Sequence, residues 1–162
     1  MKILSIALIK TKTAMALTVF MVIIISVFYY HRASNTYDIQ CESYVAYRAQ
    51  QSDTGFDMAI AMNMHHNAKG EFVIEGTMGK KNQTWSINRD ITFNYARLHN
   101  NTIKMDHINI VKYGRDNVPD DMFNDIFLST AGTSGRIITL SKVLNGYLVG
   151  NLRAPAFICL PR

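Results

Sequence analysis

Cys41 and Cys159 are the only cysteines in the sequence. Two thiols can form a disulfide, act as a nucleophile or stay buried and unpaired. Neither cysteine belongs to a Cys-x-x-Cys or nucleophile signature, which disfavours redox and catalytic roles. They fall on the first and last predicted strands, so in an oxidising compartment a disulfide would tie the two ends of one domain together. Two unpaired buried thiols remain the alternative.

The other residues capable of chemistry form no recognisable catalytic site. His65 and His66 are adjacent, and adjacent residues of a strand point to opposite faces. Gly132–Arg136 matches a nucleophile elbow for four positions, but Arg136 stands where glycine is required. We therefore predict no catalytic, metal-binding or cofactor-binding residue, no cofactor and no enzymatic activity.

An acidic cluster precedes the one predicted helix. It does not fit a calcium-binding loop, because Val118 stands where an oxygen ligand is required. We interpret its members as charges that cap the helix; they are Asp116, Asp120, Asp121 and Asp125.

Methionines recur at inward positions of two predicted strands. Such flexible side chains either fill a core or line an adaptable cavity for an amphipathic ligand. The sequence leaves both readings open for Met58, Met62, Met64 and Met78, with Phe56, Ile60, Phe72 and Ile74.

Thr13–Tyr30 is an uncharged apolar run of 18 residues, which is long enough to cross a bilayer as a helix. A cleaved signal peptide would have a shorter apolar run and small residues at its exit, whereas Phe28, Tyr29 and Tyr30 end this one. Three lysines precede it, so the positive-inside rule keeps the N-terminus in the cytoplasm.

The basic balance of the chain follows from this topology. The chain has 17 Lys and Arg and 12 Asp and Glu. Without Lys2, Lys10, Lys12 and Arg32, 13 basic residues remain against those 12 acidic ones. No basic stripe is left to follow phosphates, so direct nucleic-acid binding is not expected.

Beyond Ile39 the hydrophobic pattern has period two, which is typical of strands with one buried face. Trp85, Ile87, Ile91 and Phe93 should be buried on one face, and Arg89 interrupts that face as a bulge, a barrel-mouth residue or an ion-pair partner. Strands are predicted in ranges 39–48, 56–64, 71–78, 85–97, 102–113, 136–144, 147–152 and 156–160.

The predicted fold class is mainly β. A single N-terminal transmembrane helix precedes a small antiparallel β-barrel or strongly curved sheet with one short helix over Asp116–Ser129, although a sandwich would fit the same pattern. Pro119 is expected at the first helical position, and Asn145-Gly146 at a hairpin turn. The predicted organisation is a cytoplasmic tail (1–12), a transmembrane helix (13–30), a linker (31–38) and a periplasmic β-rich domain (39–162).

Several short motifs, in this order, resemble the FidL-like membrane proteins of enteric bacteria, and more distantly the ToxS-type partners of ToxR-like transmembrane regulators. The motifs follow the apolar segment Thr13–Tyr30. They are Tyr44-Val-Ala-Tyr47 after Cys41, the Gly70 to Gly76 hairpin, Arg89-x-Ile91-x-Phe93-x-Tyr95, Asp116-Asn-Val-Pro-Asp120 and Pro155-Ala-Phe157-Ile-Cys159.

The resemblance implies a non-enzymatic accessory protein of the bacterial inner membrane. Its periplasmic domain would pair, as a heterodimer, with a ToxR-like regulator and stabilise it or signal to it. A lipocalin-like barrel that binds a bile-salt-like or other amphipathic ligand is also implied, although no ligand-binding residue can be assigned. The alternative is an independent membrane-tethered periplasmic ligand-binding or envelope protein.

Overall fold

The computed structural model describes residues 15, 17–30, 36–49, 54–80, 83–99, 101–128 and 135–162. They fall into two compact units, Met1–Asn35 and Thr36–Arg162. In the first unit residues 17–30 are helical, and their large apolar side chains are exposed. No helix among the described residues is both long and apolar enough to qualify as a membrane span. The predicted tail 1–12, residues 13, 14 and 16 of the predicted span, and residues 31–35 of the linker lie outside the described residues.

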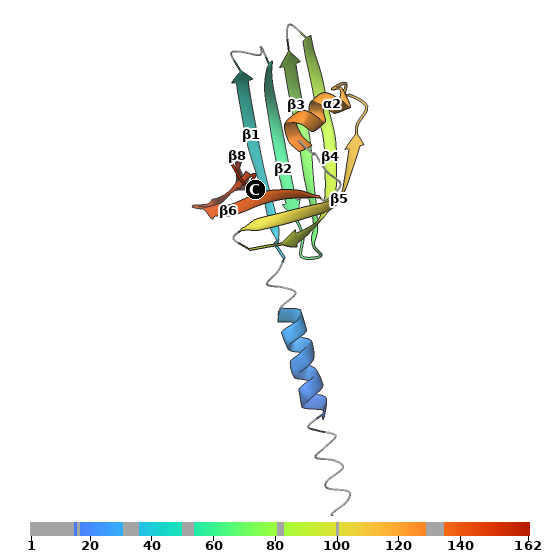
Figure 1. The fold of residues 1–162 in the computed structure, drawn as a ribbon, viewed down its shortest axis with the longest axis vertical. Coiled ribbons are helices and arrows are strands. Elements are labelled where there is room, and N and C mark those ends of the chain that lie inside the picture. Colours follow the sequence, from blue (N-terminus) through green and yellow to red (C-terminus); the bar gives the residue numbers. More distant parts are fainter. Residues whose placement is uncertain are drawn as a thin grey trace, which may run out of the picture. The chain divides into compact units, whose positions relative to one another are not determined.

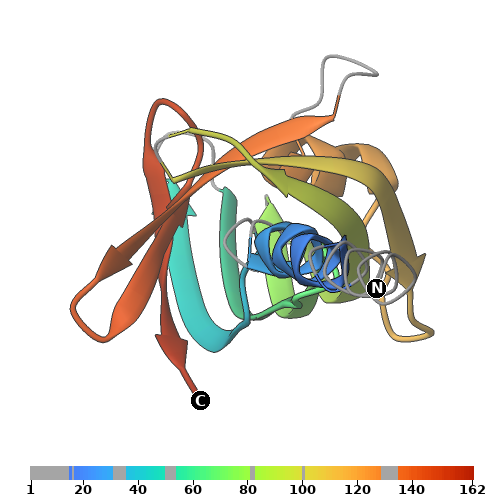
Figure 2. The ribbon, with the colours of Figure 1, turned by 90° about the horizontal axis from the view of Figure 1, so that it is seen from below.

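The second unit is a closed barrel of antiparallel strands in sequential order, as Figures 1 and 2 show. Its first five strands are joined as long neighbouring hairpins, and three shorter strands complete the wall. A short helix, α2 (Asp120–Phe123), and a π-helical turn, η1 (Asn124–Leu128), lie between β5 and β6. The strands are β1 (Ile39–Ala49), β2 (Thr54–Met64), β3 (Lys69–Lys80), β4 (Gln83–Arg97), β5 (Thr102–Lys112), β6 (Arg136–Val143), β7 (Gly146–Gly150) and β8 (Pro155–Pro161).

The alternating pattern of the strands places their apolar residues inside the barrel, as the sequence predicts. On β4, Ile87, Ile91 and Phe93 are buried while their neighbours are more exposed. The prediction that Trp85 is largely buried is wrong, because this side chain is only partly buried. It lies near the start of β4, before the part of the strand that pairs with β5.

The predicted helix begins too early and is too long. Residues 116–119 are not helical, and Pro119 occupies the N-cap position with ψ of 138°, outside the helical region. A proline disfavours helical geometry in the residue before it, and Val118 is that residue. Only Asp120–Phe123 is α-helical before η1 begins; Ser129 lies outside the described residues.

The β6–β7 turn lies one residue earlier than predicted. Val143 pairs with Gly146, so the two connecting residues are Leu144 and Asn145, and Leu144 has φ of 51°. Gly146 belongs to β7, where a Cβ atom would lie 2.7 Å from the backbone oxygen of Cys159. This close approach, rather than turn geometry, explains the glycine.

The barrel closes between its first and last strands at a short seam. Two residue pairs join β1 to β8, Cys41 with Pro161 and Glu42 with Leu160. Glu42 also forms an ion pair with Arg162. The Cys41–Cys159 disulfide crosses the same region, with the two Cα atoms 5.4 Å apart, within the range that a disulfide needs. A covalent bond therefore reinforces the place where backbone pairing is shortest.

We expect Cys41→Ser to lower the free energy of unfolding by about 4–5 kcal/mol, because the bond spans 118 residues and restricts the unfolded chain. Urea unfolding of the oxidised protein measures the loss. The reduced wild-type chain is the matched control and should unfold at nearly the same urea concentration as the variant. If Cys41→Ser, measured under oxidising conditions, had the same urea midpoint as the oxidised wild type, this role of the disulfide would be contradicted.

Candidate functional site: the cavity of the barrel

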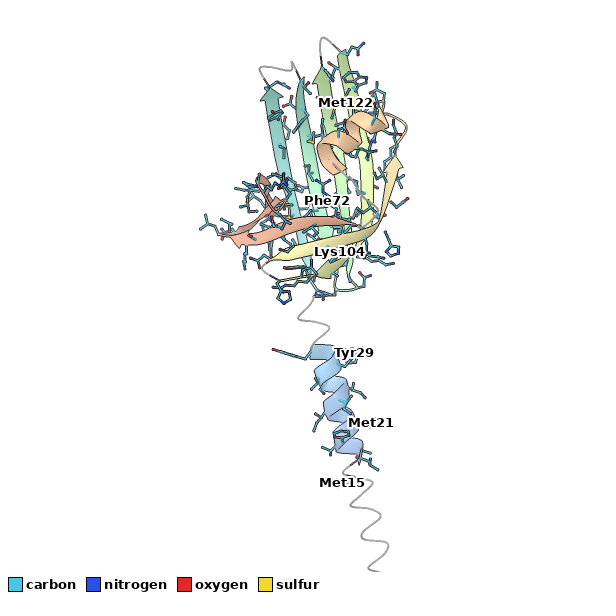
Figure 3. All side chains as sticks on the ribbon, in the orientation of Figure 1. Met15, Met21, Tyr29, Phe72, Lys104 and Met122 are labelled. Carbon is cyan, nitrogen blue, oxygen red and sulfur yellow. A yellow bond between two sulfur atoms is a disulfide. The ribbon has the colours of Figure 1, made fainter. Side chains whose placement is uncertain are left out.

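The barrel contains a cavity of about 230 Å³. It lies between two buried clusters, one that includes Cys41, Met105 and Val149 and another that includes Met58 and Phe123. Every strand and η1 contribute to its wall, which consists of Val45, Phe56, Met58, Ile60, Phe72, Ile74, Ile91, Met105, Ile126, Phe127, Arg136, Ile138, Val149, Gly150, Asn151, Ala156 and Phe157. Figure 3 labels one wall residue, Phe72, at mid-height of the barrel, with Met122 toward the end that carries α2.

The methionine-rich strands contribute both to the core and to the wall of a cavity, whereas binding of an amphipathic ligand stays a prediction. Met58 lines the cavity, as do Phe56, Ile60, Phe72 and Ile74. Met62, Met64 and Met78 are fully buried core residues outside its wall. Inward orientation can be predicted from period two, but the sequence does not tell which inward side chains meet one another and which face an empty volume.

Arg136 is the one charged residue of the cavity wall. It starts β6, and its guanidinium donates a hydrogen bond from Nη1 to the backbone oxygen of Phe127 in η1. Burial lowers the pKa of Arg136, but an arginine still carries its charge at neutral pH. Sequence reasoning gave Arg136 no role. Its parity with the buried residues Ile138 and Leu140 was the signal that could have placed it inside.

A second arginine, Arg89, is completely buried and contacts the segment from Asp116 to Phe123 that precedes η1. Its Nε and Nη2 donate to Asp116 Oδ2 and Oδ1 at 2.8 and 3.1 Å. Nη2 also donates to the backbone oxygen of Val118 at 2.7 Å and lies 2.9 Å from Asp120 Oδ1. Of the three interpretations of Arg89, the structure therefore shows the ion pair.

Asp116 does not cap the helix, contrary to the sequence interpretation. Its side chain is fully buried and accepts hydrogen bonds from the backbone N–H groups of Asn88 and Val118 at 2.9 and 3.1 Å. Burial raises its pKa, but the hydrogen bonds from Arg89 and these amides, with the positive charge of Arg89, outweigh burial and hold the pKa below its usual value.

Hydrogen bonds also attach the segment after β5 to the start of β4, on the edge that β5 leaves unpaired before Arg89. The backbone N–H of Ser86 donates to Asn117 Oδ1 at 2.7 Å, and the N–H of Asn117 donates to the Ser86 oxygen at 3.1 Å. Asp116 and Asn117 thus take the place of a neighbouring strand there. This is why residues 116–119 are extended rather than helical.

An aromatic series connects Arg89 to the cavity. The Arg89 guanidinium lies 4.2 Å from the ring centre of Phe123, a cation–π contact. Phe123 stacks on Phe127 at 4.7 Å, and Phe127 lies 6.3 Å from Phe56 on β2. Phe127 and Phe56 both line the cavity, so the Arg89–Asp116 pair positions one of its walls.

None of the histidines that the structure describes lines the cavity. His66 Nε2 lies 3.2 Å from Asp38, and His107 Nδ1 lies 2.9 Å from Asp106, both at the surface. Among the residues that the structure describes, no three His, Cys, Asp or Glu side chains gather as metal ligands would. The cavity wall contributes apolar surface and one cation, an arrangement suited to binding.

Comparison with known proteins places the chain in one family. Residues 76–159, more than half of the chain, match the family described as "FidL-like putative membrane protein". The searches of curated proteins and of solved structures found no match.

We expect Asp116→Asn to destabilise the barrel by about 3–5 kcal/mol, because it removes the buried carboxylate of the Arg89 pair and leaves only the exposed Asp120 carboxylate beside the guanidinium. Asp121→Asn, which removes an exposed carboxylate from the same segment, is the matched control and should cost less than about 0.5 kcal/mol. Chemical unfolding measures both. Equal effects of the two substitutions would contradict the structural role of the pair.

Because of the same carboxylate, we expect the stability of the barrel to fall at acid pH. Because folding lowers the pKa of Asp116 below its ordinary value of 3.8, the pair contributes its full stability above about pH 4, and this contribution is lost as the pH falls through the folded pKa. Thermal unfolding between pH 6 and pH 2 should therefore show a steeper loss for the wild type than for Asp116→Asn. Parallel curves would show that Asp116 does not contribute.

Proposed function

The chain belongs to the FidL-like membrane protein family, and from that premise we propose that it is a non-enzymatic accessory protein of the bacterial inner membrane. Its barrel lies in the periplasm, pairs with a ToxR-like membrane-bound transcriptional regulator, and stabilises it or signals to it when an amphipathic ligand binds. The observation that carries the ligand-binding part is the cavity of about 230 Å³ with a mainly apolar wall and one cation.

The membrane anchor of this proposal is Thr13–Tyr30. The run has no charged residue, and Lys2, Lys10 and Lys12 precede it, which favours a cytoplasmic N-terminus. The described part of the run is helical and exposes apolar side chains from Leu17 to Tyr30. Lipid would cover this surface at no cost to the barrel, which has its own core.

The composition of the cavity wall supports a binding role over a catalytic one. Among the described residues that line the cavity there is no aspartate, glutamate, histidine, cysteine or serine, so the side chains that serve as general bases and nucleophiles are missing from this set.

The alternative function is that of an independent, membrane-tethered periplasmic ligand-binding or envelope protein. The cavity of about 230 Å³ favours it, because ligand binding in an apolar cavity does not itself require a regulator. The two functions differ in whether a regulator binds the barrel.

The proposed topology predicts that alkaline phosphatase fused after Arg162 is active, because the enzyme requires the oxidising periplasm. The full-length, uncleaved fusion should fractionate with the membrane. A fusion lacking residues 13–30 is the control and should be inactive. Activity of a reporter that works only in the cytoplasm, at the same junction, would overturn the orientation.

The proposed partnership predicts that the tagged full-length chain co-purifies with the ToxR-like regulator expressed from a neighbouring gene. Removal of the barrel from the tagged chain, with the membrane segment kept, should abolish co-purification, since the barrel is the proposed contact. Regulator recovered equally with both chains, or with neither, would contradict pairing through the barrel.

A further inference from the structure

We propose that the cavity binds a single-chain anionic amphiphile, a medium-chain carboxylate, whose carboxylate pairs with Arg136 and whose alkyl chain lies against the apolar wall. This inference rests on the ligand-binding part of the proposed function and specifies the ligand class. It assigns Arg136 as the residue that selects the head group.

The charge of Arg136 has no counterpart in the cavity. No acidic residue belongs to the wall, and none of the ion pairs among the described residues includes Arg136, which donates to the Phe127 carbonyl. A guanidinium has five N–H donors, so most of its donor capacity remains for another acceptor. A carboxylate can accept two parallel hydrogen bonds from it.

Placing a cation against apolar surface costs free energy unless an anion accompanies it. Arg89 shows how the same protein satisfies a buried guanidinium, with a carboxylate at 2.8 Å and two further acceptors. Arg136 is partly buried, but no carboxylate of the described residues pairs with it. A ligand that brings one negative charge supplies what the wall lacks, whereas a cationic ligand would add repulsion.

The size of the cavity favours an alkyl chain over a fused-ring ligand. An engineered cavity of about 150 Å³ accommodates benzene, so by proportion about 230 Å³ has room for about nine carbon atoms. A flexible chain can follow a wall built from Met58, Met105 and Phe157, whose side chains adjust to it. A steroid skeleton is larger and rigid, and would require the wall to move outward.

The test is equilibrium binding of radiolabelled decanoate to the full-length chain in zwitterionic lipid nanodiscs, with binding to empty nanodiscs subtracted. We expect saturable binding that unlabelled decanoate displaces. Decanol and decyltrimethylammonium, which keep the chain length but lack the anion, should displace at least tenfold less effectively, and so should taurocholate, an anionic steroid.

Arg136→Gln should weaken decanoate binding roughly tenfold to hundredfold, the loss expected for a charge-assisted contact. Lys142→Gln is the matched control because it removes an exposed cation from the same strand, and it should bind as the wild type does. Arg136→Lys, which keeps the charge, should bind more tightly than Arg136→Gln. Val45→Phe should weaken binding by filling the cavity while Arg136 remains.

Cooperative unfolding of each variant shows that it has folded. Three results would overturn the proposal: no saturable decanoate binding by the wild type, equal binding by Arg136→Gln and the wild type, or taurocholate displacing decanoate more effectively than decanoate itself. None depends on the regulator. Decanoate binding without regulator pairing would refute the partnership alone, and pairing without decanoate binding would refute this inference alone.

Discussion

The ion pair between Arg89 and Asp116 determines how the chain leaves the wall of the barrel after β5. Arg89 points inward from β4, and Asp116 reaches it from the following segment, where both side chains are removed from water. Neither charge could remain there alone without a large desolvation cost. The position of residues 113–119, and of the helical turns after them, therefore depends on this pair. Loss of either partner should release the segment and the cavity wall that Phe127 provides.

The closure of the barrel is a second constraint, and it joins the first strand, β1, to the last, β8. Hairpin neighbours such as β1 and β2 pair along their whole lengths, whereas β1 and β8 share two residue pairs. Closing this seam brings together residues far apart in the chain, which has a high entropic cost. The Cys41–Cys159 bond reduces that cost by restricting the unfolded chain. The fold gains this stabilisation only where the two thiols can be oxidised.

The strands could be predicted from sequence because alternate residues of a strand point to opposite faces, so apolar side chains recur at every second position. The first and last strands were predicted from the same pattern. The helix start could not, because Asp116 is equally suited to capping a helix and to pairing with a distant arginine. The cavity could not be predicted from sequence either. Met58 and Met62 both occupy inward positions of β2, yet Met58 lines the cavity and Met62 packs in the core. Only the three-dimensional structure distinguishes these two environments.

Arg89 and Arg136 occupy inward positions that look alike in the sequence, yet their surroundings assign them opposite roles. Arg89 is already paired with two carboxylates, a backbone oxygen and an aromatic ring, so its contribution is to stability. Arg136 touches one backbone oxygen and faces the cavity. That same oxygen belongs to Phe127, whose ring lies in the series that begins at Arg89. An anion bound at Arg136 would therefore lie next to the end of η1, where the same guanidinium donates to Phe127.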